Sequence, residues 1–153
     1  MQHLSFPLIK PTGLIAKSMI YAVFQKSYAV EALLLKHNDF PPLKRTVYEI
    51  QQSKTLFYGY YIEAQLCGVM ELEMYKNHIH IRSLTVAPEF FRKGIGHRLL
   101  CFVRDEFQVD LLTVETGHDN FPAVNFYLNF GFKKNKVWMT EVGIEKISFT
   151  LSK

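Results

Sequence analysis

The stretch from Leu84 to Leu100, LTVAPEFFRKGIGHRLL, constrains the fold more than any other part of this sequence. Leu84 and Val86 alternate with a polar residue, which is the period of a β-strand with one buried face. Pro88 lacks a backbone donor and should end that strand. Two glycines then precede apolar residues that are spaced as on one face of a helix. The sequence predicts a strand, a glycine-containing turn and a helix in direct succession.

A turn of this kind at the start of a helix is a candidate site for an anion. The first backbone N–H groups of a helix have no intrahelical partner, and the helix dipole favours negative charge there. Gly94 and Gly96 let a phosphate approach the backbone without meeting a Cβ atom, and Arg92 and Lys93 add positive charge. A diphosphate is therefore a good candidate ligand, and an ordinary turn that happens to hold two glycines is the alternative. The dinucleotide fingerprint does not fit, because Leu99 occupies the third glycine position, and no Lys-Ser/Thr pair follows as in a P-loop.

The composition is that of a globular domain. Hydrophobic residues make up 48% of the 153 positions and charged residues 21%, which suffices for a core and excludes a disordered chain. The net charge of +4 suits a polyanionic small molecule. Because the charges are scattered rather than gathered in a basic tail, they argue against nucleic acid as the partner. We expect one domain over residues 1–153.

The cysteines and the chain start indicate a cellular setting. Cys67 and Cys101 form no disulfide framework and no CxxC pair, so a reducing compartment is expected. The first residues lack a charged and then apolar leader, and no apolar run approaches the length of a membrane span. The histidines have no metal-ligand spacing. We therefore expect a cytoplasmic protein with no membrane association and no metal.

The first two-thirds of the chain should supply helices and then an antiparallel meander. Residues 4–9 form a possible first strand. Residues 14–37 have helical spacing, as one helix or as two with a break near Tyr28, and residues 46–54 suggest a short second helix. From Leu56 the period changes to two, and short connections that join antiparallel neighbours separate three strand-like runs, namely 56–63, 66–75 and 78–86.

The third of these runs contains a phase shift. Ile79 and Ile81 share one face, whereas Leu84 and Val86 fall on the opposite parity. One extra residue near Arg82–Ser83, a β-bulge, would reconcile the two pairs. The bulge would splay this strand from its next neighbour and open a cleft. A strand buried on both faces is the alternative.

The segment after the glycine turn predicts a βαβ crossover. A helix over Gly94–Phe107 is followed by an apolar strand over Leu111–Glu115, which should lie parallel to the strand before the turn. After a loop over Gly117–Pro122, a short helix is expected over Ala123–Asn129. The chain then closes with an antiparallel pair of strands, residues 132–141 and 144–152.

Two motifs together resemble the GNAT superfamily of acetyl-CoA-dependent N-acetyltransferases. LTVAPEFFRKGIGHRLL resembles the strand, pyrophosphate loop and helix of that family, and NFPAVNFYLNFGF, Asn120 to Phe132, resembles its Asn…Ala…Tyr…Gly-Phe signature. The resemblance covers about residues 56–132, and residues 1–50 match only in being helical. It implies a mixed α+β fold with a central, mostly antiparallel sheet and helices on both faces. That sheet would be splayed between its fourth and fifth strands, here 78–86 and 111–115.

The resemblance also implies a reaction and a cofactor site. An acetyl group would pass directly from acetyl-CoA to a primary amine of a small molecule or peptide while both are bound. Phe91 stands where the family usually has Gln or Arg, which puts the usual side-chain contact to the phosphates in question. A non-catalytic module that binds coenzyme A or another anion is the alternative. The cofactor would be bound by the strand, the loop and one asparagine: Leu84, Thr85, Val86, Phe91, Arg92, Lys93, Gly94, Ile95, Gly96, His97 and Asn120.

Transfer to an amine needs a base for the amine proton and benefits from an acid beside the leaving thiolate. Tyr127 is the candidate acid, because it matches the family's tyrosine and a phenol can donate a proton; packing of its ring in the core is compatible with that role. Glu115 matches the base of some ribosomal-protein acetyltransferases of the family. The alternative interpretation of Glu115 is a carboxylate in a surface ion pair. His80 is a second candidate base because an imidazole titrates in the useful range. The alternative interpretation of His80 is an exposed histidine on a strand with no catalytic role. Glu73 is a weaker third candidate.

The acceptor and the oligomeric state have no motif in this sequence. The first helices and the loop around Asp39–Arg45 should wall the acceptor side, where Glu31, Asp39 and Glu73 favour a cationic amine. The aromatic-rich C-terminal strands could pair two chains into a homodimer.

Overall fold

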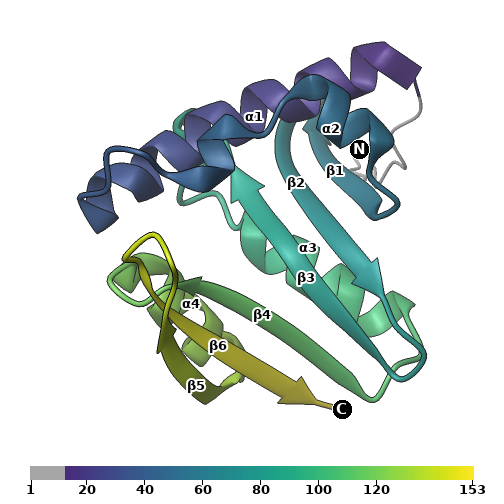
Figure 1. The fold of residues 1–153 in the computed structure, drawn as a ribbon. Helices are drawn as coiled ribbons and strands as arrows, with labels where there is room; N and C mark the ends of the chain where they lie inside the picture. The colour runs from purple at the N-terminus through teal and green to yellow at the C-terminus, as the bar shows by residue number, and fades with distance from the viewer. Residues whose placement is uncertain (1–12) are drawn as a thin grey trace.

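The computed structural model describes residues 13–153, so the possible strand at residues 4–9 lies outside the described part. A six-stranded mixed sheet runs through these residues in the order β1-β2-β3-β4-β6-β5 (Figure 1). Only β3 and β4 are parallel neighbours, as the crossover prediction requires. The strands are β1 (Leu56–Ile62), β2 (Gln65–Met74), β3 (His78–Val86), β4 (Leu111–Gly117), β5 (Lys133–Met139) and β6 (Glu145–Ser152).

Helices cover both faces of the sheet, as predicted (Figure 1). On one face, α1 (Gly13–Leu35) and α2 (Val47–Gln52) pack against β1 and β2 around Phe24, Ile50 and Val69. On the other face, α3 (Ile95–Glu106) and α4 (Phe121–Phe130) pack against the centre of the sheet. Two short 3₁₀ helices, η1 (Pro41–Lys44) and η2 (Pro88–Phe90), occupy the proline-containing turns. The sheet is therefore the middle of three layers.

The first helix runs through Tyr28 without a break, which decides between the one-helix and two-helix predictions. It ends at Leu35, and Lys36 follows in the left-handed region with φ of 54°. After the proline turn, Thr46 and Glu49 form a capping box that starts α2: each side chain accepts a hydrogen bond from the other residue's backbone N–H. These local signals place α1 and α2 on the same face of the sheet.

The predicted β-bulge is present in β3. Glu71 pairs with Ser83 and its neighbour Leu72 pairs with Ile81, which leaves Arg82 as the extra residue. Leu84 therefore joins the same apolar core as Ile81 despite the change of parity. Beyond the bulge Ser83 and Thr85 are buried on the opposite face, so the alternative of a strand buried on both faces also holds for this end of β3.

The bulge coincides with the splay of the sheet. The ladder between β3 and β4 ends at the pair Ile81 and Val114, although both strands continue beyond it. Figure 1 shows β3 rising toward α1 while β4 turns away beside β6. The predicted opening between the strands 78–86 and 111–115 is thus confirmed.

The start of α4 differs from the prediction. The helix begins at Phe121, two residues earlier than expected, because Asn120 caps it and Pro122 lies in its first turn. The Asn120 side chain accepts a hydrogen bond from Ala123 N at 3.3 Å. The predicted loop is correspondingly shorter, and β4 extends to Gly117 rather than ending at Glu115.

Candidate active site

A cavity of about 1530 Å³ opens where β3 and β4 part. Side chains and backbone of β3, the loop before α3 and the start of α4 line one side of it. The C-terminal half of α1, η1 and the turn between β5 and β6 line the other. The three residues that the sequence predicts for catalysis, His80, Glu115 and Tyr127, border this one cavity.

The loop before α3 has the geometry of an anion site. Gly94 is the N-cap of α3 with φ of 78°, and no described side chain caps the helix. The first intrahelical bond runs from Arg98 N to Gly94 O, so the preceding amides of the first turn have no partner in the helix. A Cβ atom at Gly94 would meet no atom within 4 Å. Open space thus lies beside uncapped backbone donors, where an anion can approach.

The second glycine of the loop has a different role from the one predicted. A Cβ atom at Gly96 would lie 3.2 Å from Cζ of Phe126. Its missing side chain therefore lets α3 pack closely on α4, although both Gly94 and Gly96 line the cavity. A Cβ atom at Gly96 would be in tight contact with the Phe126 ring, so this glycine serves helix packing, and its part in binding a phosphate stays a prediction.

The outer edge of β3 offers unpaired backbone groups above the bulge. Ala87 N donates a 2.9 Å hydrogen bond to Cys67 O on the β2 side. Because successive residues of a strand direct their backbone groups to opposite sides, Thr85 also faces β2, whereas Leu84 and Val86 face the side that β4 has left. An extended ligand can pair with that edge as a further strand would.

The remaining loop residues are exposed. The Phe91 side chain is 44% exposed, and Arg92 adopts φ of 66° beside exposed Lys93. Asn120 lies across the cavity and donates from Nδ2 to Thr116 Oγ1 at 3.5 Å, in addition to capping α4. Its structural role as a turn residue is thus present, and its side chain also borders the cavity.

Tyr127 combines a buried ring with a place on the cavity wall. Its side chain is 5% exposed, and its ring packs against Phe132 and Phe149. Burial raises the pKa of Tyr127 well above its ordinary value, and the nearby charges of Glu31 and Tyr28 raise it further. The phenol therefore keeps its proton at neutral pH and can act as a donor.

The two candidate bases lie close together but are already engaged. Glu115 accepts a 2.9 Å hydrogen bond from the Lys146 ammonium. His80 Nδ1 lies 2.7 Å from Thr113 Oγ1 on the paired position of β4. Burial lowers the pKa of His80, an effect that the charge of Glu115 partly opposes. His80 is thus a neutral, half-buried imidazole rather than the exposed strand histidine of the alternative.

A buried ionic network that the sequence did not reveal lies beside the cavity, between the loop before α2 and strand β2. Glu71 of β2 is fully buried, and the Arg45 guanidinium donates to its two oxygens at 2.6 and 2.9 Å. Thr55 and Ser83 also donate to it, at 2.7 and 3.1 Å. Burial by itself raises the pKa of Glu71, but the hydrogen bonds from Arg45 and Thr55 outweigh it and hold this pKa below the ordinary value. The network fixes the loop before α2 to the bulged part of β3.

The first helix spans the splay and contacts both diverging strands. Tyr28 donates a 3.0 Å hydrogen bond to Ser83 of β3. One turn later, Glu31 Oε2 accepts hydrogen bonds from Thr116 Oγ1 at 3.2 Å and Gly117 N at 3.4 Å on β4. The side chain of Leu35 occupies the space in which a Cβ atom at Gly117 would lie. Helix α1 therefore forms a wall of the cavity between the two diverging strands.

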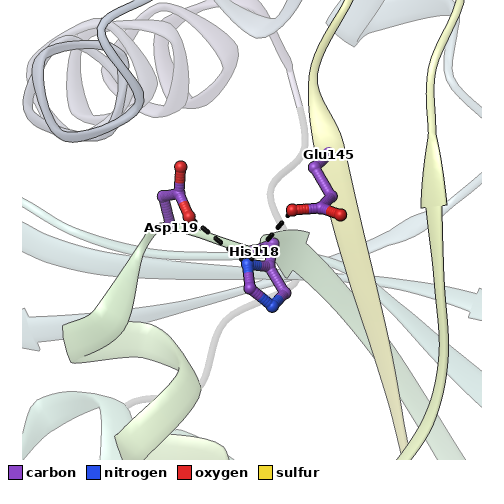
Figure 2. Close-up of side chains that lie close together, drawn as sticks. All are labelled: His118, Asp119 and Glu145. Carbon is purple, nitrogen blue, oxygen red and sulfur yellow. Dashed lines mark hydrogen bonds and ion pairs between the residues drawn. The ribbon is translucent and has the colours of Figure 1, made fainter.

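One group of side chains outside the cavity offers potential metal ligands. Figure 2 shows His118, Asp119 and Glu145, whose ligand atoms all lie within 4.8 Å of one another. His118 Nδ1 lies 3.3 Å from a carboxylate oxygen of each partner. Sequence spacing did not indicate this group because Glu145 comes from a distant strand. Its two carboxylates are exposed, and acidic groups on protein surfaces commonly gather in this way without a metal.

Comparisons with known proteins agree with the fold. The model of the acetyltransferase (GNAT) domain family matches residues 31–153. The chain therefore belongs to the GNAT acetyltransferase family, as the two motifs predicted. None of the helices in the described residues is both long enough and apolar enough to span a membrane.

Solved structures with little sequence identity share the same fold. The PaiA N-acetyltransferase of Thermoplasma acidophilum, solved with coenzyme A, superposes with a TM-score of 0.75 at 18% identity, covering 95% of this chain and 98% of that one. The ribosomal-protein-S18-alanine N-acetyltransferase of Escherichia coli gives a TM-score of 0.76 at 18% identity, covering 97% and 94%.

A curated relative is closer in sequence but much longer. The UPF0157 protein YqkA of Bacillus subtilis is 37% identical over 116 residues, which are 75% of this chain. The chain spans only 34% of the length of that relative.

Proposed function

We propose that this protein transfers an acetyl group from acetyl-CoA directly to a primary amine of a small molecule or peptide, with both substrates bound together. The observation that carries the proposal is the open backbone surface made by the uncapped start of α3, Gly94 and the free edge of β3. Such a surface suits a ligand with a diphosphate at one end and an extended amide-containing arm at the other. The coenzyme A bound to the PaiA N-acetyltransferase supports this choice of ligand.

The residues present fit acetyl-CoA in three respects. The first-turn amides of α3 would hold the diphosphate, with Arg92 and Lys93 adding positive charge. Leu84 and Val86 would pair with the amides of the arm and direct the thioester toward the splay. Asn120, on the opposite wall, can turn its amide to the arm. No metal ion is needed for these contacts.

The chain's own groups would then move protons around the reacting thioester. As the carbon–nitrogen bond forms and the carbon–sulfur bond breaks, the sulfur gains negative charge and takes a proton most readily from a nearby acid. Tyr127 suits this role because it borders the cavity and is protonated at neutral pH, although its raised pKa means that it gives up the proton only as negative charge develops on the sulfur. A backbone N–H of the β3 edge would stabilise the negative oxygen of the tetrahedral intermediate.

Glu115 and His80 remain the sequence-derived candidates for the base. Each can accept a proton only at some cost in free energy. Glu115 would lose its ion pair with Lys146, and His80 already uses one ring nitrogen in its contact with Thr113. Either could act through a bound water molecule.

Acetylation of a panel of primary amines tests the proposal. Release of free thiol from acetyl-CoA should depend on the amine, and acetyl-CoA should raise the melting temperature, since a ligand that binds only the folded state stabilises it. Tyr127→Phe should lower kcat by about 10²-fold and leave the Kd of acetyl-CoA unchanged, because only the proton donor is lost. Tyr58→Phe is the matched control, since Tyr58 is also a buried tyrosine but lies outside the cavity.

The outcomes distinguish the enzyme from a binding module. A higher melting temperature without turnover on any amine would support the non-catalytic alternative, for which the exposed Phe91 in the usual Gln or Arg position is the argument. No change in melting temperature at saturating acetyl-CoA would overturn the cofactor assignment.

A further inference from the structure

We propose that Glu31 of α1 binds the ammonium group of the acceptor and takes its proton, and that the acceptor is a monoamine carried on an apolar body. The proposal rests on the proposed function and names the residue and substrate class at the same site. It assigns the acceptor side to the first helix, where the sequence carried no motif.

The first support is the pairing of the carboxylates around the cavity, since most of them already have a partner. Four glutamates line it: Glu31, Glu49, Glu73 and Glu115. Glu115 pairs with Lys146 at 2.9 Å, and Glu73 lies 3.6 Å from Arg82. Glu49 accepts the backbone N–H of Thr46 in the capping box. Among the described side chains, no cation lies within ion-pair distance of Glu31.

The second support is the hydrogen bonding of Glu31 itself. Both of its described donors, Thr116 Oγ1 and Gly117 N, contact the same oxygen, Oε2. Within residues 13–153, Oε1 has no hydrogen-bond partner. The two donors hold the carboxylate in place at the mouth of the splay, and one oxygen remains for a ligand. An ammonium supplies the charge and the N–H donors that this oxygen lacks.

The third support is the position of Glu31 relative to the candidate acid. Tyr28 lies one turn before Glu31 on α1, and both border the same cavity as Tyr127. An amine held by Glu31 would thus lie near the group expected to protonate the leaving thiolate. Neither tyrosine carries a charge at neutral pH that competes for the ammonium, because burial raises both pKa values.

The class of amine follows from what surrounds Glu31 on the acceptor side. Leu34, one turn along α1, is 41% exposed and lines the cavity with Trp138 and Val142 of the β5–β6 hairpin. The hairpin turn lies against the end of α1, where His37 Nε2 is 3.1 Å from Val142 O (Figure 1). These side chains form an apolar rim. A second ammonium would find Glu73 and Glu115 already paired with cations and Glu49 already accepting two hydrogen bonds from Thr46, which disfavours diamines and polyamines.

The proton and bond changes balance without a further reactant. The ammonium R–NH₃⁺ gives one proton to the Glu31 carboxylate and becomes R–NH₂. The amine nitrogen bonds to the acetyl carbon, the carbon–sulfur bond breaks, and the sulfur leaves with its electron pair. The thiolate takes the Tyr127 proton, and the second proton of the new amide nitrogen restores the phenol. Glu31 releases its proton to solvent.

The test compares Glu31→Gln and Glu31→Ala with the unchanged protein on four acceptors: an arylalkyl monoamine, an aliphatic monoamine, a diamine and a polyamine. Glutamine keeps an acceptor oxygen for Thr116 and Gly117 and removes only the charge, whereas alanine removes both. We expect Glu31→Gln to lower kcat/KM for the amine by about 10²-fold and to leave the Kd of acetyl-CoA unchanged. The rate of this variant should recover at a pH above the pKa of the amine, where the free base no longer needs Glu31.

Glu106→Gln is the matched control, because Glu106 is an exposed glutamate on α3 outside the cavity. It should behave as the unchanged protein. Wild-type rates for Glu31→Gln, or a defect in Glu31→Ala alone, would show a purely structural role and overturn the assignment of Glu31. A higher kcat/KM for the diamine or polyamine than for the arylalkyl monoamine would overturn the substrate class. If the unchanged protein binds acetyl-CoA but acetylates none of the four amines, the proposed function itself fails.

Discussion

The two walls of the cavity are built from different groups. The wall that we propose for acetyl-CoA, called here the cofactor wall, offers backbone groups, the first-turn amides of α3 and the free edge of β3, behind which lies an apolar core. The acceptor wall offers side chains from α1 and the loop before α2, and behind it lies the buried pair of Glu71 and Arg45. Backbone groups are present whatever the sequence, whereas a side-chain network requires particular residues at distant positions.

This contrast has consequences for how substitutions should act. On the cofactor wall, a change of side chain alters the binding of the ligand but leaves the donors in place. On the acceptor wall, the loss of one member of the ionic network leaves its partner buried and unpaired, which is costly. Stability should therefore be most sensitive on the acceptor side and cofactor affinity on the other.

The largest expected effect is on the buried pair. Glu71→Gln removes the charge that Arg45 contacts and should lower the free energy of unfolding by about 3–5 kcal/mol, because breaking a buried ion pair leaves an uncompensated charge. Urea denaturation measures it. Replacing both Glu71 and Arg45 by leucine should cost less than Glu71→Gln alone. A double variant that is less stable than the single one would show that the pair itself, rather than the unpaired charge, carries the effect.

The same pair predicts a dependence of stability on pH. The pKa of Glu71 in the folded state lies below its ordinary value of 4.5, so its contribution is complete above that value and is lost as the pH falls through the folded pKa. Glu71→Gln should flatten this acid limb of the unfolding curve. If Glu71→Gln loses stability at low pH as steeply as the unchanged protein, other carboxylates cause this loss.

The next effect tests the cofactor wall through two matched glycines. Gly94 and Gly143 have φ of 78° and 80°, and a Cβ atom at either would meet nothing within 4 Å. Alanine at each should therefore cost a similar stability, about 1 kcal/mol for the left-handed backbone. Only Gly94 borders the large cavity, so Gly94→Ala should also weaken acetyl-CoA binding about tenfold, or 1.4 kcal/mol. Equal affinities of the two variants in calorimetric titration would place the diphosphate elsewhere.

The same contrast separates what the sequence could predict from what it could not. The cofactor wall is encoded locally: a strand, Pro88 and Gly94 follow one another, and the parity of Ile81 and Leu84 alone indicated the bulge that splays the sheet. Contacts between distant elements carry no such signal. The phenyl ring that packs against Gly96 belongs to Phe126, thirty positions along the chain, and only the folded structure brings it there.

The acceptor wall was largely hidden for the same reason. Arg45 and Glu71 lie 26 residues apart, and Glu31 meets Gly117 across 86. Neither spacing follows a helical or strand period. One signal was available, since Glu71 interrupts a run of strand residues whose neighbours are buried. A charged residue at such a position needs a partner, but the sequence does not say which cation supplies it.

The smallest expected effect concerns the one departure from the family's loop. Phe91 is 44% exposed, so its replacement removes little buried area. Phe91→Arg would place a cation beside the start of α3, where an exposed ion pair with a phosphate is worth about 0.2–1 kcal/mol. The affinity for acetyl-CoA should rise about two- to fivefold, and the gain should shrink as salt screens the charge. Phe91→Gln, which adds a donor without a charge, should give a smaller gain that does not depend on salt. A loss of affinity in both variants would mean that the Phe91 ring itself contacts the cofactor, and that this wall, too, depends on a particular side chain.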